Sequence, residues 1–212
     1  YRIVDLPGTY SLASTSEDEE IARDFILFGQ PDVTVMVADA TRLERNMNMV
    51  LQVLQITDRA VLCVNLIDEA TRNHIEIDLR ALSRRLGIPV VGASARIGQG
   101  IGELLEAVRA VATGEYVCRP PRGFDLPADT AAEVDRLTAA VRQAHPSLSN
   151  AEWIATRLLE RDEGVRRAYA TPELTALADE IHLAIGHNFH DRWMEQIYAQ
   201  AGEICAAVVR RQ

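Results

Sequence analysis

Short apolar runs alternate, over the first 112 residues, with longer segments in which apolar residues recur every three or four positions. A strand that is covered on both faces reads as a short, nearly continuous apolar run, because helices pack on each side of a parallel sheet. The alternation therefore predicts βα units around a mainly parallel sheet. The runs that we predict as strands are 1–4, 33–38, 60–65 and 89–94.

Segments with helical periodicity fill the gaps between these runs. Ser16 to Glu19 and Thr41 to Glu44 have the spacing of a capping box, which favours a helix start. A third segment opens on Asp78 and closes on Gly87, as an N-cap and a C-terminal glycine would. The acidic run 17–20 is interpreted as favourable charge at a helix N-terminus rather than a metal or partner site. We predict helices at 17–28, 42–56, 78–87 and 100–112.

The pattern changes at 116–128, where prolines and a glycine interrupt any continuous element. Beyond this linker no strand signal remains, and Thr171 followed by Pro172 is a strong helix start. We therefore predict an α/β domain over 1–115 and a small all-α domain over 129–212. The helices predicted in the second domain are 129–144, 150–162, 172–186 and 190–211.

The charge balance narrows the classes of partner. The 212 residues hold 22 Lys and Arg against 31 Asp and Glu, a net charge of −9. This charge opposes binding to nucleic acid, or to an anionic membrane over a wide surface.

The cysteines Cys63, Cys118 and Cys205 lie far apart in apolar surroundings, which is typical of reduced thiols in a cytosolic protein. No run approaches the length of a membrane-spanning helix.

Asp5-Leu6-Pro7-Gly8 follows the first predicted strand and has the form D-x-x-G. This is the third nucleotide-binding element of P-loop GTPases. The carboxylate of Asp5 could hold a Mg²⁺-bound water, and the N–H of Gly8 could approach a γ-phosphate. Alone, the motif is common in ordinary turns.

Asn65-Leu66-Ile67-Asp68 ends the third predicted strand and has the form N-x-x-D. An aspartate here can accept hydrogen bonds from the N1 and N2 protons of guanine, a donor pair that adenine lacks. The asparagine fixes the neighbouring loop and touches the base. Leu66 replaces the usual lysine, which keeps apolar packing on the base but removes a charge contact.

Ser94-Ala95-Arg96 ends the fourth predicted strand and matches the loop whose backbone N–H groups reach the guanine O6. The three motifs come in the order of a compact GTPase, each at the carboxyl end of a strand, where doubly wound sheets bind ligands. They predict a Ras-like P-loop GTPase domain with three layers and a mainly parallel sheet, followed by the helical domain.

No G-x-x-x-x-G-K-[ST] occurs in the sequence, so the loop that cradles phosphates is not among these residues. We expect that loop and the first switch to precede Tyr1, in roughly 50 residues. Without them, these residues alone are expected to lack GTPase activity.

The stretch "DLPGTYSL" (5–12), with "ARDF" (22–25), "PDV" (31–33) and "DATRLERNM" (39–47), is similar to one family over about 1–112. This is the cytosolic GTPase domain of the bacterial ferrous iron transport protein B family, FeoB. The resemblance implies GTP or GDP and Mg²⁺ as ligands, with K⁺ in some members, and slow hydrolysis that regulates Fe²⁺ transport. It also implies a helical domain that slows nucleotide release and connects to the membrane part.

The resemblance further implies that a multi-pass domain of the bacterial inner membrane follows Gln212, with this chain as its cytoplasmic portion. Small cytosolic Feo accessory proteins and a homo-oligomer are the partners that it suggests. Thr9 stands where Ras-like proteins often carry a water-orienting glutamine. We therefore hypothesise that backbone groups at Gly8 and Thr9, rather than a side chain, position the attacking water.

Other interpretations stay open. A soluble GTPase of ribosome or tRNA biogenesis shares the three motifs but usually carries a basic appendage, and an interaction module could keep the fold without turnover.

Gly98 to Gly102 lacks the spacing of a dinucleotide fingerprint. His182, His187 and His190 could suggest an iron site, but their spacing does not place all three on one helical face. Solvated or capping histidines are the favoured interpretation.

Overall fold

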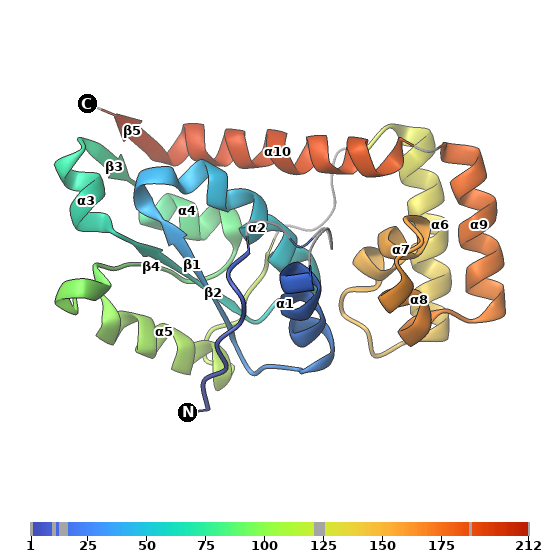
Figure 1. The fold of residues 1–212 in the computed structure, drawn as a ribbon, viewed down its shortest axis with the longest axis horizontal. Helices are drawn as coiled ribbons and strands as arrows, with labels where there is room; N and C mark the ends of the chain where they lie inside the picture. The colour runs from blue at the N-terminus through green and yellow to red at the C-terminus, as the bar shows by residue number, and fades with distance from the viewer. Residues whose placement is uncertain (1, 10–11, 13–16, 121–125, 187, 212) are drawn as a thin grey trace. The chain divides into compact units, whose positions relative to one another are not determined.

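The computed structural model divides into two compact units along the chain, one formed by Tyr1–Arg122 with Ala199–Gln212 and the other by Gly123–Tyr198. Figure 1 shows the ribbon with each helix and strand labelled. Each unit is described by itself below. The residues that the structure describes are 2–9, 12, 17–120, 126–186 and 188–211.

The first unit is built on a parallel sheet with the strand order β1-β2-β4. In register, Val35 pairs with Val61 and Leu62 pairs with Val90. The central strand is β2, whose residues 60–64 are at most 4% exposed, as a strand covered on both faces should be. The predictions for 33–38, 60–65 and 89–94 are thus confirmed. The strands are β1 (Thr34–Asp39), β2 (Ala60–Asn65) and β4 (Val90–Gly92).

The strand predicted at 1–4 is wrong over its described residues, because 2–4 form no regular element. Ile3 is 86% exposed. Strands are stabilised by their neighbours' hydrogen bonds, and no ladder in the described part of the chain includes this segment. An apolar composition alone therefore does not make this segment a strand.

Helices cover both faces of the sheet (Figure 1). Helix α2 packs on β1 and α4 on β4, while α5 packs against β2 from the other side. The four helix predictions for this unit are confirmed to within a residue or two. The bounds are α1 (Glu17–Phe28), α2 (Leu43–Ile56), α4 (Leu79–Leu86) and α5 (Ile101–Ala112).

The capping predictions had mixed outcomes. Asp78 accepts from Ala81 N at 2.8 Å and Gly87 has a φ of 64°, so both ends of α4 are as predicted. The capping box at Thr41 is wrong, because Thr41 lies in a 3-10 turn (Ala40–Arg42) before α2. Asp39 is the cap there, and its Oδ1 accepts from the backbone N–H and the hydroxyl of Thr41, each at 2.7 Å. Ser16 lies outside the described residues.

In the first unit, three short elements were not predicted: α3 (Ile67–Arg72), β3 (Ile75–Ile77) and β5 (Val209–Arg211). β3 and β5 form an antiparallel ladder in which Glu76 faces Arg210. The helix predicted over 190–211 is accordingly too long, since α10 (Phe189–Val208) stops where β5 begins. A three-residue strand is too short to show an alternating pattern of apolar and polar residues, and its partner strand lies far away in the sequence.

The second unit is all helical in its described part, and its core is apolar. Leu137, Ile154, Leu158 and Ile181 are fully buried. The start of α9 is confirmed, because the Thr171 hydroxyl oxygen accepts from Leu174 N at 3.2 Å. Its helices are α6 (Ala128–Ala144), α7 (Ala151–Leu159), α8 (Glu163–Tyr169), α9 (Pro172–Ile185) and the first half of α10.

The helix predicted at 150–162 corresponds to α7 but is too long, because α7 ends at Leu159; α8, which starts at Glu163, was not predicted. Asp162 caps the new helix by accepting from Val165 N at 2.9 Å. Of the larger aromatic residues, Trp153 and Trp193 are buried, whereas Tyr198 is 56% exposed. None of the described helices is both long and apolar enough to cross a membrane.

The histidines of this unit contact oxygen atoms of the protein. His182 Nδ1 lies 3.0 Å from Leu159 O, and His190 Nδ1 lies 2.8 Å from Glu160 Oε1. His187 is outside the described residues. Glu160 also receives Arg157 Nη2 at 2.6 Å, so the carboxylate joins α7 to α10.

This contact predicts a pH-dependent contribution to stability. The hydrogen bond to Glu160 raises the pKa of His190, so the folded state holds the proton more tightly than the unfolded state. The contribution is complete below the unfolded pKa, about 6.5, and is lost as pH rises through the raised pKa. Because His190 is 43% exposed, we expect only about 0.5 kcal/mol.

Melting temperatures of the wild type and His190→Gln, compared at pH 5.5 and pH 8.5, test this expectation. The variant should be less stable at the lower pH and close to wild type at the higher one. His74→Gln, an exposed histidine of the first unit, is the control. A deficit of equal size at both pH values would show that the ion pair is not the cause.

Candidate functional site

Two loops meet at the carboxyl edge of the parallel sheet. Asn65 to Asp68 begin at the last residue of β2, and Ser94 to Arg96 follow β4. Val64 and Gly92 are paired in register, and Ala93 N donates to Val64 O at 2.8 Å while Ile67 N donates to Ala93 O at 3.1 Å. The strands therefore end side by side, and the loops leave them together.

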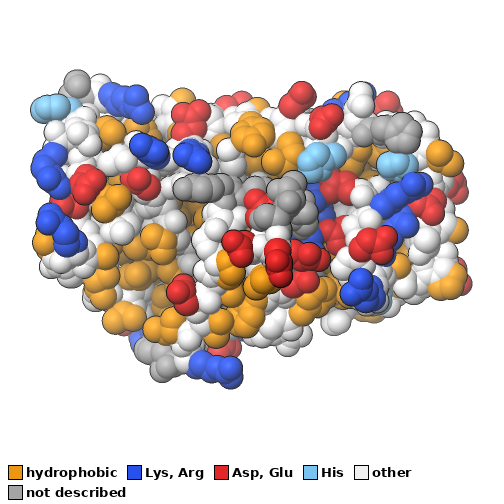
Figure 2. Space-filling model, in the orientation of Figure 1, with side chains coloured by type: hydrophobic (Ala, Val, Ile, Leu, Met, Phe, Trp, Pro, Cys, Tyr) orange, Lys and Arg blue, Asp and Glu red, His pale blue; other side chains and the backbone are white. Residues whose placement is uncertain are grey.

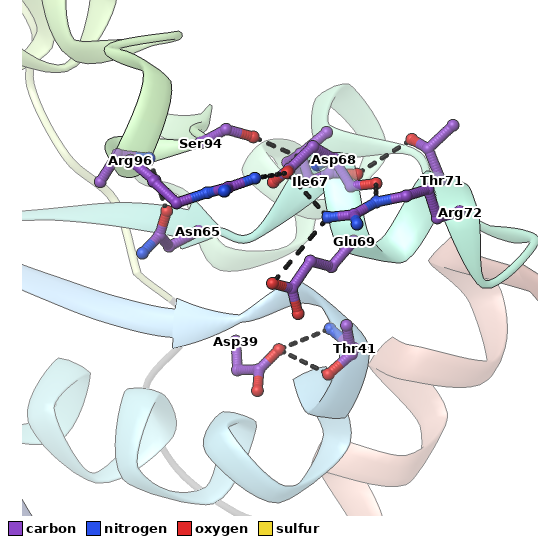
Figure 3. A network of polar contacts seen from close by, with 11 residues as sticks. Asp39, Thr41, Asn65, Ile67, Asp68, Glu69, Thr71, Arg72, Ser94 and Arg96 are labelled. Carbon is purple, nitrogen blue, oxygen red and sulfur yellow. Dashed lines mark hydrogen bonds and ion pairs between the residues drawn. The ribbon is translucent and has the colours of Figure 1, made fainter.

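Side chains of each loop bond to the backbone of the other (Figure 3). Asn65 Oδ1 accepts from Ala95 N at 3.1 Å, and Ser94 Oγ accepts from Asp68 N at 3.1 Å. These two bonds fix the loops against each other. The asparagine was expected to hold the neighbouring loop, and the geometry places it there.

The Asp68 carboxylate lies at the centre of this network. Arg72 Nη2 is 3.1 Å from its Oδ2, and Arg96 Nη2 is 3.8 Å from the same atom. Hydrogen bonding to Ser94, and then the charge of Arg72, holds the pKa of Asp68 below its usual value. The carboxylate is thus ionised at neutral pH and can only accept hydrogen bonds. Its side chain is 26% exposed, so a ligand can reach it.

The backbone at Leu66 turns sharply, with a φ of 64° in the left-handed region. A non-glycine residue adopts this conformation at a cost of about 1 kcal/mol, which the surrounding contacts must offset. After the turn, Ile67 packs over the backbone of Gly92, where an added Cβ would lie 3.2 Å from Ile67 Cγ1. The turn thus directs Ile67 to the sheet and places Asp68 at the start of α3.

The loop after β4 closes back on its own strand. Ser94 N donates to Gln99 O at 3.0 Å, and Gly98 and Gly100 have φ values of 73° and 80°. A Cβ on Gly100 would lie 2.2 Å from Gly92 O, so only glycine allows this approach. The glycines at 98–102, which lack a dinucleotide fingerprint, instead shape this loop.

The Asp5 to Gly8 segment stands apart from this network. Asp5 and Gly8 are exposed and Leu6 and Pro7 half-buried, in a stretch without regular structure. Within the described residues, no hydrogen bond or ion pair joins Asp5 or Gly8 to the two loops. The structure therefore brings together the second and third sequence motifs but does not connect the first to them.

Sequence reasoning missed a third polar loop at the same edge, after β1. Asp39 pairs in register with Asn65, and its backbone N–H donates to Asn46 Oδ1 at 2.6 Å. Figure 3 shows Asp39 and Thr41 near Glu69 of α3. The signal was available, because Asp39 also follows a predicted strand. Sequence reasoning also missed Arg72. This residue lies four positions after Asp68 on a helix, so the two side chains share one face of α3.

Comparison with known proteins decides the family. The family model described as "Ferrous iron transport protein B" matches residues 1–108, and that of the "FeoB cytosolic helical domain" matches residues 127–210. The chain belongs to the FeoB family. The expected Ras-like GTPase domain, with a mainly parallel sheet and a following helical domain, is confirmed.

Curated relatives of this FeoB-family chain include the "Fe(2+) transporter FeoB" of Salmonella typhimurium, 38% identical over 172 residues, and that of Escherichia coli K12, 37% identical. Each match covers 79% of the chain and 22% of the relative. The chain thus spans about a fifth of the length of these relatives.

Solved structures with this fold include FeoB domains in several nucleotide states. A mutant of S. thermophilus NFeoB bound to GDP has a TM-score of 0.83 at 24% identity, covering 97% of this chain and 80% of that one. The T. maritima FeoB cytosolic domain in its apo form has a TM-score of 0.76 at 26% identity, covering 97% and 79%. Its GMPPNP form has a TM-score of 0.78 at 25% identity, covering 98% and 80%.

Proposed function

We propose that this chain is the guanine-nucleotide-binding cytosolic domain of an Fe²⁺ transporter of the bacterial inner membrane. The observation that carries the proposal is the ionised Asp68 carboxylate, held at the sheet edge beside the loop 94–96. Family membership supports it, as do the GDP and GMPPNP forms of the T. maritima relative.

Base selection would rest on Asp68, which accepts from the N1 and N2 protons of guanine. Arg72 and Arg96 hold its Oδ2 in this structure, so guanine binding requires them to release or share that atom. The N–H groups of Ser94 and Ala95 are used within the two loops, which leaves that of Arg96 as the donor toward the guanine O6. Leu66 would give the base apolar contact, whereas Ile67 packs toward the sheet.

Phosphate binding would involve the Asp5 to Gly8 segment. Mg²⁺ usually retains several waters and takes only one or two carboxylates besides the phosphates, so an exposed Asp5 suits a water-mediated contact. The N–H of Gly8 would contact the γ-phosphate, and Leu6 and Pro7 would shape the turn. Mg²⁺ supplies neutralisation of phosphate charge, and K⁺ would assist in the same way.

The regulatory part of the proposal assigns a role to each domain. Residues 1–115 would bind the nucleotide, and 129–212, after the linker 116–128, would slow its release. A membrane domain after Gln212 would be the main partner, with small Feo accessory proteins and a second copy of the chain as further ones. Slow hydrolysis would then set how long the transporter stays in its GTP state.

Isothermal titration of GDP, GTP and ATP tests the proposal. The protein used must include a phosphate loop, because the 212 residues contain no G-x-x-x-x-G-K-[ST]. GDP and GTP should bind much more tightly than ATP. Equal affinity for ATP would contradict the base-reading site, whereas guanine binding without any hydrolysis would favour an interaction module.

The hydrolysis step itself gives a further prediction. If backbone groups at Gly8 and Thr9 position the water, Thr9→Ala should leave the GTP turnover number within about threefold of wild type. Single-turnover release of phosphate, measured with the phosphate loop present, is the readout. A Thr9→Ala rate that collapses by several orders of magnitude would instead assign the step to the Thr9 hydroxyl.

A further inference from the structure

Five arginines on two neighbouring elements of the first unit form a group that we name the basic patch. All five are exposed, and neither α4 nor β5 contains an acidic residue. The chain as a whole carries a net charge of −9, so this concentration of positive charge stands out. The members are Arg80, Arg84 and Arg85 of α4 and Arg210 and Arg211 of β5.

The fold assembles the basic patch from segments far apart in the sequence. The β3–β5 ladder holds Arg210 and Arg211, and Asp78 N, at the start of α4, donates to Val208 O at 2.9 Å. Figure 1 shows β5 beside β3 at the carboxyl end of the chain, and Figure 2 shows basic side chains gathered around this end. On α4, the core stripe of Leu82 and Leu86 is buried, which leaves its arginines on the outside.

Acidic neighbours offset only part of this charge. Glu76 faces Arg210 across the ladder, and the carboxylate of Asp78 accepts from Ala81 N as the cap of α4. Across the described residues, none of the five arginines makes an ion pair. Their exposed guanidinium groups are thus available for a ligand.

We propose that the basic patch docks on anionic lipid headgroups of the membrane. This inference rests on the proposed function, in which a membrane domain follows Gln212, next to β5. That connection would hold the patch close to the bilayer surface, where the potential of anionic lipids extends for a Debye length, about 8–10 Å. Guanidinium groups suit the phosphates of headgroups, since each can donate two parallel hydrogen bonds.

The expected strength is modest for an untethered domain. Each basic residue near an anionic surface increases partitioning about fivefold, and tethering to a membrane domain raises the effective concentration further. The net negative charge elsewhere predicts that only this end of the first unit faces the lipid. The expectation that the net charge opposes binding to an anionic membrane concerned a wide surface, whereas the basic patch is a small part of the surface.

Co-sedimentation of the 212-residue chain with vesicles tests the inference. Vesicles of phosphatidylglycerol mixed with phosphatidylcholine should bind the wild type, and phosphatidylcholine alone should not. The double variant Arg80→Glu, Arg84→Glu should lose at least about 20-fold in partitioning. The matched control, Arg142→Glu with Arg192→Glu, makes the same charge change at exposed positions of the second unit and should bind like wild type.

Thermal unfolding of the variants separates loss of binding from loss of folding. The double variant Arg80→Gln, Arg84→Gln removes the same charges without reversing them and is the milder test. The inference is overturned if the wild type ignores anionic vesicles, or if the patch and control variants lose binding equally. Guanine titration is read separately: preserved guanine selectivity with no vesicle binding removes this inference alone. Lost selectivity with intact vesicle binding removes the proposed nucleotide function instead.

Discussion

Asp68→Asn is expected to weaken GDP binding about 100-fold and to leave the weak affinity for ATP unchanged. Asparagine keeps one acceptor but places an NH₂ group where the second carboxylate oxygen was, so a guanine N–H meets a donor. Hydrogen bonds to charged groups are worth about 1.5–3 kcal/mol each, and losing about 3 kcal/mol is roughly 100-fold in Kd. The loss of selectivity, more than of affinity, identifies a base-reading residue.

Isothermal titration of GDP and ATP, with the phosphate loop present, measures this change. Glu69→Gln is the matched control, because it removes one negative charge from the same turn of α3 at a side chain that is 47% exposed. Arg72 is 63% exposed, so loss of the Asp68–Arg72 ion pair should change the unfolding free energy little. An Asp68→Asn variant that still prefers guanine would place base recognition elsewhere.

Gly100→Ala is expected to lower the free energy of unfolding by about 3 kcal/mol. The left-handed backbone at φ 80° costs an alanine about 1–2 kcal/mol. In addition, the new Cβ would lie 2.2 Å from Gly92 O and 2.9 Å from Ala93 Cα, both backbone atoms that cannot rotate away. Relieving such an overlap costs a further 1–3 kcal/mol, roughly, through a backbone shift.

The same loop supplies the control for this substitution. Gly98 also has a left-handed φ, of 73°, but an added Cβ there would meet nothing within 4 Å. Gly98→Ala should therefore lose only the conformational part, about 1 kcal/mol. Urea unfolding monitored by circular dichroism measures both variants. Equal losses would mean that the close approach of Gly100 to Gly92 contributes nothing to stability.

Much of the first unit could be predicted because its strands are buried runs bounded by clear helix starts. The 60–65 run was predicted to the residue, since β2 is covered on both faces and its composition shows it. The ladder between β3 and β5 could not be predicted in this way, because three residues show no period and their pairing is non-local. The segment 2–4 shows the converse error, in which an apolar run has no ladder to join.

In the candidate site, too, some features could be predicted from the sequence and others could not. Asn65, Asp68 and Ser94 were found because their residue types and their places after strands carry the information. The left-handed turn at Leu66 and the approach of Arg96 to Asp68 were not found. Both depend on backbone and side-chain conformations that the surrounding structure determines, and a sequence pattern does not encode these conformations.

The β3–β5 ladder also affects when this protein can fold during synthesis. Its two strands lie on either side of the helical segment in the sequence, so β5 leaves the ribosome only after that whole segment has been made. The helical segment, by contrast, has mostly local neighbours and can form while it emerges. The first unit, although its sheet is made first, is therefore expected to be the later of the two to finish folding.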